Sequence, residues 1–297
     1  MREFAAEMLA VDGIRVPIGM SYSVQAGKGT EMRFVNIDLA RRLELAEANA
    51  ARECTQNFMA LRQSCGAALL EIMGGVASFT GIDSPITQAV ALGLNGPVNE
   101  EQMDQLEDFY RSLGAAVNIE VCPLADPVLL ELIGRRKYRP IEFSNVLFKE
   151  ISGATTFDPP HGMRFRETQE GEEKLWAETV SKGFAENVPV TPELVDIMET
   201  FAHRESVRPY LAWAGDEIAG GCAFSAHAGV GGLFGASTLP AMRRRGIQSA
   251  MISLRVAAAA AAGCDIAMSI AQVGSASHRN LERQGFSVAY TRVKFTG

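Results

Sequence analysis

The stretch that decides the fold is LFGASTLPAMRRRGIQSAMISLRVAAAAAA, residues 233–262. It begins with a strand-like run, Leu233–Thr238, which Leu239-Pro240 stops because proline lacks the N–H that a strand ladder needs. A basic loop, Arg243–Gly246, follows. From Ile247 the apolar residues recur at the helical period, and a run of alanines extends that helix. The stretch therefore predicts a strand, a glycine turn and a helix.

This arrangement predicts an anion site. A strand that turns into a helix directs several backbone N–H groups at one point, and the helix N-terminus adds partial positive charge there. Arg243, Arg244 and Arg245 oppose that charge unless an anion lies between them, which favours a bound phosphate over a solvated basic helix start.

The bulk composition is that of a globular protein. The chain has 297 residues, 47% of them hydrophobic, which suits one large domain or two ordinary ones. A net charge of −7 argues against a general nucleic-acid binder. The five cysteines form no C-x-x-C pair, which indicates a reducing compartment, and no His, Cys or carboxylate cluster has metal spacing.

Targeting signals are not apparent in this sequence. It shows no basic-then-apolar leader, and no uninterrupted apolar run is long enough to span a membrane. The alanine-rich helix contains Arg255 and is followed by Gly263. We therefore expect a cytoplasmic protein without membrane partners.

Periodicity and turn residues divide the chain into two similar α/β halves. Segment 1–30 is left open as a strand or an arm, and the segment around Pro159-Pro160 is the best linker. Expected helices are 36–63 (one or two), 99–114, 128–133, 173–184 (Leu175, Trp176, Val180 and Phe184 inward), 192–201, 247–262 and 277–284. Expected strands are 67–73, 76–79, 86–94, 117–122, 141–151, 163–167, 208–213, 218–225, 233–238, 265–270 and 288–295.

The two halves share an order of elements, with Val117 and Asp265 opening equivalent strands whose positions differ by 148. The same offset places Lys137-Tyr138 on Gly285-Phe286, so we infer an internal duplication. The expected domains are 1–151 and 165–297, joined by a linker at 152–164.

The second half resembles the GNAT superfamily of N-acetyltransferases. Arg243-x-x-Gly246 fits that family's cofactor loop, Pro240 precedes it, and Gly285-Phe286 matches a downstream Gly-Phe pair. The likeness covers about residues 164–297. The first half looks like a degenerate copy, because its loop, residues 95–101, lacks arginine and carries carboxylates that would repel a pyrophosphate.

The resemblance implies a fold and a cofactor. The fold would be two tandem acyl-CoA N-acyltransferase-like domains, each a mixed, mostly antiparallel sheet flanked by helices. The cofactor would be acetyl-CoA, its pyrophosphate on the amides of residues 244–249 and its pantetheine arm beside the end of strand 233–238. The implied cofactor-binding residues are Thr238, Leu239, Arg243, Arg244, Arg245, Gly246, Ile247, Gln248, Ser249 and Asn280.

The sequence departs from the family where catalysis is expected. Gln248 replaces the last small residue of the loop, Leu281 replaces the tyrosine that acts as an acid, and Gly274 replaces an asparagine. The strand 233–238 carries no glutamate as a base. The catalytic residues therefore stay unassigned, and several polar residues are each weighed against an ordinary surface or capping role: His203, Glu205, His227, Glu167, Glu170, Ser275, Ser277 and Asn280.

These observations predict an N-acetyltransferase that moves an acetyl group from acetyl-CoA to an amine of a small molecule or peptide by direct attack. The rival from another class is a non-catalytic acyl-CoA-binding or interaction protein that keeps the cofactor loop. Expected partners are the amine acceptor and, as one candidate assembly, a second copy in a homodimer; no nucleic acid is expected.

Overall fold

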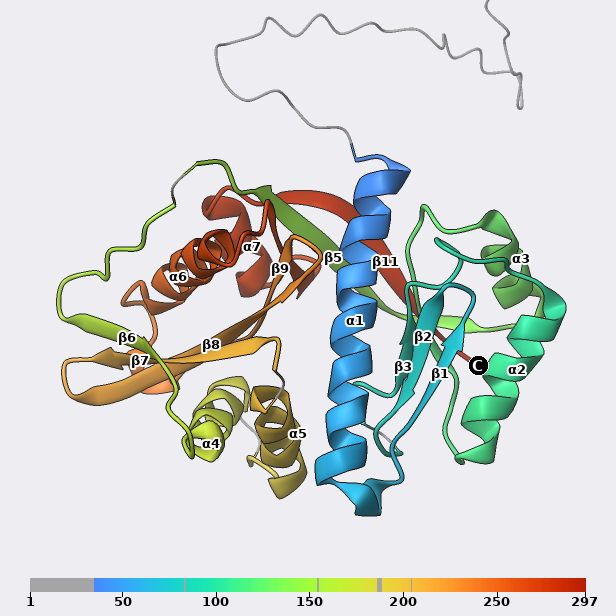
Figure 1. Ribbon diagram of the computed structural model, residues 1–297, viewed down its shortest axis with the longest axis horizontal. Coiled ribbons are helices and arrows are strands. Elements are labelled where there is room, and N and C mark those ends of the chain that lie inside the picture. The colour runs from blue at the N-terminus through green and yellow to red at the C-terminus, as the bar shows by residue number, and fades with distance from the viewer. Residues whose placement is uncertain (1–34, 83, 154, 186–188, 204) are drawn as a thin grey trace, which may run out of the picture. The chain divides into compact units, whose positions relative to one another are not determined.

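A computed structural model describes residues 35–297 apart from positions 83, 154, 186–188 and 204 (Figure 1). The segment 1–30, for which the sequence leaves a strand or an arm open, lies outside the described residues. In the part that the structure describes, no helix combines the length and apolar character that crossing a bilayer requires.

The described strands form one eleven-stranded sheet in the order β1-β2-β3-β4-β11-β5-β10-β9-β8-β7-β6. Neighbours are antiparallel except β3 with β4 and β9 with β10, which are parallel. This confirms a mixed, mostly antiparallel α/β fold. The strands are β1 (Ala68–Ile72), β2 (Gly75–Phe79), β3 (Gln88–Val90), β4 (Asn118–Val121), β5 (Arg139–Glu150), β6 (Met163–Glu167), β7 (Val207–Ala214), β8 (Glu217–His227), β9 (Val230–Thr238), β10 (Ile266–Gln272) and β11 (Ser287–Thr296).

Helices cover both faces of this sheet. On one face α1 packs on β-strand residues of both halves, and α4 and α5 pack beside it. On the other face α2 and α3 cover the first half and α6 and α7 the second. The helices are α1 (Ile37–Leu61), α2 (Glu100–Ser112), α3 (Pro127–Arg135), α4 (Glu173–Phe184), α5 (Pro192–Ala202), α6 (Ile247–Ala261) and α7 (Ala276–Arg283), with 3₁₀ turns at Gln63–Cys65 and Pro240–Met242.

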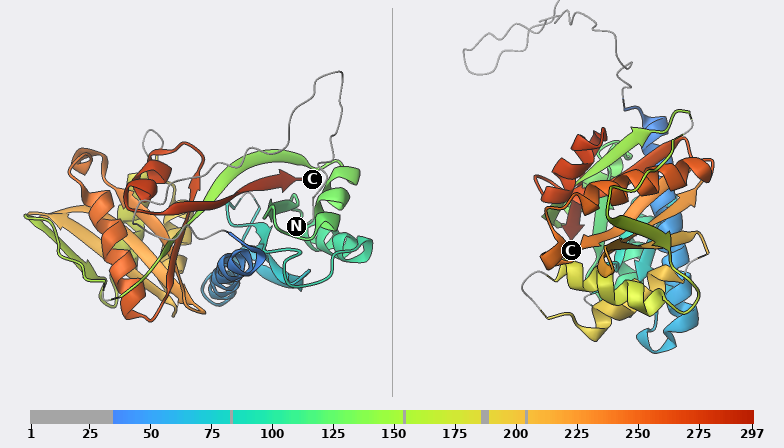
Figure 2. Two further views of the ribbon diagram at one scale, coloured as in Figure 1. Left: turned by 90° about the horizontal axis from the view of Figure 1, so that it is seen from above. Right: turned by 90° about the vertical axis from the view of Figure 1, so that its left-hand side faces the viewer.

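The final strand of each half pairs with strands of the other half. β11 pairs with β4 and β5 of the first half, while β5 pairs with β10 and β11 of the second. Both are long strands that run between the two groups of helices (Figure 2). This exchange makes the sheet continuous across the halves.

The 148-residue offset recurs in the backbone where α3 leads to β5 and α7 leads to β11. Lys137 and Gly285 both adopt left-handed φ angles, 63° and 80°. The amide of Tyr138 donates to the carbonyl of Ile133 (3.2 Å), and that of Phe286 to Leu281 (3.1 Å). The same helix ending therefore occurs twice at the spacing that the sequence indicated.

Two details differ from the sequence expectations, and a third decides between two alternatives. Leu175 and Phe184 do not point inward: they are 39% and 49% exposed, because α4 buries Trp176, Ala177 and Val180 instead. Met163 and Arg164, counted in the linker 152–164, lie in β6. The helical segment 36–63, expected as one helix or two, is one helix, α1, capped by the Asn36 side chain.

A buried charged cluster fastens α1 to β11. The guanidinium of Arg292 contacts Glu47 (2.5 Å), Glu120 (3.3 Å) and Glu44 (3.4 Å). The hydroxyl of Tyr290 donates to Glu44 at 2.8 Å. Burial raises the pKa of Glu44, and the positive charge of Arg292 partly offsets that effect.

Candidate active site

The site begins where β9 and β10 separate. These parallel strands pair only over Val230–Gly232 and Ile266–Met268. Beyond that point β9 continues along β8 and β10 continues along β5. We call the resulting opening the fork. The Ser269 hydroxyl donates to the Leu233 carbonyl across its base at 2.9 Å.

A β-bulge lies in β9 beside the fork. The register with β8 shifts between Gly221/Ser237 and Ala223/Phe234, leaving one extra residue on β9. Gly235 has φ 57°, and a Cβ there would come within 3.1 Å of the Trp176 ring, so only glycine fits this position without strain. A bulge interrupts the ladder of hydrogen bonds, which leaves backbone polar groups of β9 available to a ligand.

The basic loop ends at a helix N-terminus that the chain does not cap. Arg244 and Gly246 adopt left-handed φ angles of 64° and 81°, which turn the chain sharply into α6. Gly246 has no capping side chain, so the first-turn amides, from Ile247 to Ser249, lack an intrahelical acceptor. Arg244 and Arg245 are exposed beside these amides. This geometry fits the pyrophosphate of a nucleotide cofactor.

The remaining predicted cofactor residues lie around this loop in different roles. Arg243 turns inward and donates to the carbonyls of Gly183 (3.0 Å) and Thr238 (3.3 Å), so it holds the loop against α4 and β9. Thr238 and Leu239 end β9 and are half-buried. Asn280 of α7 donates to the Gln248 side chain at 2.9 Å and thereby joins α7 to α6.

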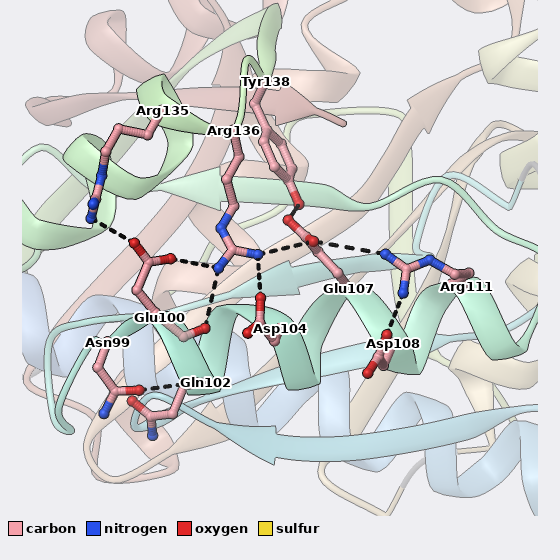
Figure 3. Close-up of polar contacts among 10 residues, drawn as sticks. All are labelled: Asn99, Glu100, Gln102, Asp104, Glu107, Asp108, Arg111, Arg135, Arg136 and Tyr138. Atoms are coloured by element: carbon pink, nitrogen blue, oxygen red, sulfur yellow. Dashed lines mark hydrogen bonds and ion pairs between the residues drawn. The ribbon is translucent and has the colours of Figure 1, made fainter.

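The matching helix of the first half is closed at the same end. The Asn99 side chain accepts from the Gln102 amide at 2.9 Å (Figure 3). Glu100 and Glu101 place negative charge in the first turn. An anion would meet both an existing cap and repelling carboxylates there.

Carboxylates of α2 also bind arginines of the neighbouring α3 end. Arg136 contacts Glu100 (2.6 Å), Asp104 (2.7 Å) and Glu107 (3.0 Å), and Arg135 contacts Glu100 at 2.9 Å (Figure 3). Charged side chains around the start of α2 are therefore paired with one another, whereas the N-terminus of α6 has no side-chain cap.

A cavity of about 360 Å³ passes through the sheet at the fork. From the α6–α7 face it is lined by Gln248, Ile252, Arg255, Ser277 and Leu281. From the opposite face it is lined by α1, by the ends of α4 and α5, and by strands of both halves. Two reactants could therefore meet at the fork from opposite faces of the sheet.

His227 is not the surface residue that the sequence suggested. It ends β8, its side chain is only 9% exposed, and it lines the cavity on the α1 face. Its Nε2 lies 3.8 Å from the Glu53 carboxylate of α1, which also accepts a hydrogen bond from the Ser206 hydroxyl. An imidazole beside a carboxylate can accept a proton, so the pair can act as a base in this cavity.

The other weighed residues take ordinary positions. His203, Glu205, Glu167 and Glu170 are exposed and do not line the cavity. Ser275 caps α7 by accepting from the His278 amide at 3.1 Å, whereas Ser277 lines the cavity. Leu281 is 2% exposed and belongs to the core under α6.

Sequence reasoning missed the contribution of α1 and the position of Arg255. Glu47 and Cys54 line the cavity, and Glu53 lies beside His227, although positions 53 and 227 are 174 residues apart in the chain. No local pattern marks them. Arg255 did leave a signal, since a single arginine interrupts an otherwise apolar helix face.

Comparison with known proteins agrees with this geometry. Residues 172–286, in the second half of the chain, match the family model described as Acetyltransferase (GNAT) family. The GNAT fold is generally that of acyl-CoA-dependent acetyltransferases. No curated protein matches the sequence.

Solved structures extend the likeness in fold to both halves of the chain. A GCN5-related N-acetyltransferase from Kribbella flavida is similar with a TM-score of 0.58 and 17% identity, over 83% of this chain and 95% of that one. A tandem GNAT protein from the clavulanic acid biosynthesis pathway is similar with a TM-score of 0.54 and 13% identity, over 78% of each chain. At these identities the likeness is one of fold.

Proposed function

We propose that this protein transfers an acetyl group from acetyl-CoA to an amine of a small molecule or peptide. The observation that carries the proposal is the cavity through the fork, with an uncapped helix N-terminus on one side and an imidazole–carboxylate pair on the other. We further propose that residues 1–151 form a degenerate acetyltransferase-like domain and residues 165–297 the cofactor-binding one.

The residues around α6 would hold the cofactor. Amides of residues 244–249 donate to the pyrophosphate, and Arg244 and Arg245 add charge-assisted bonds to phosphates. Arg243 keeps the loop in place through the two carbonyls that it binds. Thr238 and Leu239 would flank the pantetheine arm. Bound acetyl-CoA supplies the acetyl group as a thioester.

The opposite face would receive the amine. α1 closes this part of the cavity, so the first half shapes the acceptor site. An amine enters as an ammonium ion and must lose a proton before it can attack a carbonyl carbon. His227 accepts that proton, and Glu53 stabilises the imidazolium that forms. As the new C–N bond forms, the C–S bond of the thioester would break, and the leaving thiolate would take up the second proton that the attached nitrogen loses. The backbone of the β9 bulge offers hydrogen bonds to a developing oxyanion.

A second function has one observation in its favour. Leu281 occupies the position of the family's usual acid and is packed in the core, which would suit an acyl-CoA-binding protein without catalysis. The two functions share the cofactor site and differ in turnover.

Two measurements test these functions in sequence. Acetyl-CoA at about a hundred times its Kd should stabilise the protein by about 2.7 kcal/mol, visible as a raised melting temperature. No shift at saturating acetyl-CoA would reject both functions. If the shift appears, thiol release across a panel of amines decides: release above the amine-free rate supports transfer, and its absence supports the binding protein.

A further inference from the structure

Arg255 is a buried cation in the wall of the cavity. It lies on α6, is 3% exposed, and lines the cavity from the α6 face. Its Nε donates to the Met251 carbonyl at 3.0 Å, and its Nη1 donates to the carbonyls of Phe234 (3.2 Å) and Ala223 (3.4 Å). These bonds leave Nη2 without an acceptor among the described residues.

The charge of Arg255 is not balanced within the described chain. No described carboxylate forms an ion pair with it, whereas the equally buried Arg292 contacts three. The nearby Cys222 does not balance it, because burial raises the pKa of that thiol to about 11 and keeps it neutral at pH 7. Buried charges in proteins are normally paired, because an isolated ion loses its hydration.

The location of Arg255 connects it to the proposed reaction. One of its acceptors is Phe234, the residue immediately before the bulge glycine, Gly235. A group bound to Nη2 would therefore lie close to the fork, where the two substrates would meet. The rest of the cavity on the α1 side is largely apolar, with Ala50, Ala51, Ile86, Val90 and Phe201 in its wall. The Glu47 carboxylate also lines it and is paired with Arg292 at 2.5 Å.

We propose that Arg255 binds the carboxylate of a substrate whose remaining part is apolar. This inference rests on the proposed function and narrows its substrate class. One source of the carboxylate is the acceptor, which would then resemble an apolar amino acid, with its amine at the fork. The other source is an acyl group that itself ends in a carboxylate.

The affinities of two ligands that differ in charge test whether the cavity binds a carboxylate, and the measurement requires no catalysis. Phenylacetate and phenylacetamide have nearly the same shape, and only the first is anionic. Calorimetry on the full chain should show phenylacetate binding roughly ten-fold more tightly, because hydrogen bonds to charged groups are the stronger ones. Equal affinities would overturn the proposal. This result does not depend on acetyl-CoA, so it stays separable from failure of the proposed function.

Three variants test whether Arg255 causes the tighter binding of phenylacetate over phenylacetamide. Arg255→Met keeps the volume and should abolish the preference, while Arg255→Lys keeps the charge and should retain part of it. Arg283→Gln, on an exposed position of α7, removes the same charge and should leave the preference unchanged. A preference that survives Arg255→Met would overturn the assignment. Should that variant fail to fold by circular dichroism, a crystal with 4-bromophenylacetate decides, since a carboxylate away from Arg255 would equally refute it.

Transfer assays then distinguish the two sources. With acetyl-CoA, phenylalanine outperforming phenethylamine in kcat/KM would place the carboxylate on the acceptor. With phenethylamine as the amine, succinyl-CoA outperforming acetyl-CoA would place it on the acyl group. Either preference should be lost in Arg255→Met and partly retained in Arg255→Lys, which keeps the charge without the planar fork of the guanidinium. If neither pair shows a preference while transfer occurs, the proposal is wrong.

Discussion

At the scale of single residues, the proposed acceptor side of the cavity depends on His227. This residue ends β8, and its Nε2 lies 3.8 Å from the Glu53 carboxylate of α1, so the proposed proton-accepting pair combines residues from both halves. The sequence could not single out His227, because the carboxylate that gives it a role comes from a helix folded over it. A lone histidine at a strand end is otherwise an ordinary surface residue.

His227→Gln should lower kcat/KM for acetyl transfer at pH 7 by about a hundred-fold, since general bases typically contribute that much. The loss should shrink above pH 9, where more of the free amine is already neutral. A pH profile of kcat/KM checks this. Exposed His203→Gln is the matched control and should leave the profile unchanged. A loss that is the same at every pH would show that His227 does not accept the proton.

At the scale of elements, two matched helices differ at the end where we place the cofactor site in the second half. α2 begins with a capping asparagine and two glutamates, whereas α6 begins with glycine and no cap. Both beginnings could be predicted, because capping residues and glycine turns are local signals. The inward arginine Arg243 could not, since its acceptors lie on α4 and β9.

The attachment of α1 to β11 should depend on pH through Glu44. Burial holds the folded-state pKa of Glu44 above its ordinary value of 4.5. At a pH between the ordinary pKa of 4.5 and the higher folded-state pKa, Glu44 keeps a proton in the folded chain that it releases in the unfolded chain. The contribution of this proton to the free energy of unfolding is fully present below pH 4.5 and is lost as the pH rises through the folded-state pKa of Glu44.

Glu44→Gln, which preserves the acceptor for Tyr290, should remove that dependence. Urea unfolding of wild type and variant from pH 4.5 to 8 measures it, and the stability of wild type relative to the variant should fall as the pH rises. Exposed Glu131→Gln serves as the control and should track wild type. Curves for Glu44→Gln that run parallel to wild type would contradict the account.

At the scale of the whole molecule, the exchange of β5 and β11 makes each half incomplete alone. The second half without β5 would expose the facing edges of β10 and β11, and unpaired edges promote aggregation. Residues 155–297 expressed alone should therefore be insoluble. Co-expression with residues 35–153 should yield a soluble complex that co-purifies. A soluble, monomeric fragment 155–297 that melts cooperatively would contradict this.

This exchange also marks what the sequence could not predict. Element types, the order of elements and the 148-residue repeat follow from local periodicity, caps and glycines. Strand order does not, because pairing partners such as β5 and β10 are more than a hundred residues apart, as positions 150 and 266 show. The cavity depends on that order, so its α1 wall could not be predicted either.

The central claim is that the uncapped start of α6 binds the phosphates of acetyl-CoA, and calorimetric titration tests it most directly. Wild type should bind acetyl-CoA, and Arg244→Glu with Arg245→Glu should weaken binding by at least about ten-fold, because carboxylates would oppose the anion at the same amides. Arg283→Glu, exposed on α7, should bind as wild type does. No binding to wild type, or unchanged affinity in the double variant, would contradict the claim.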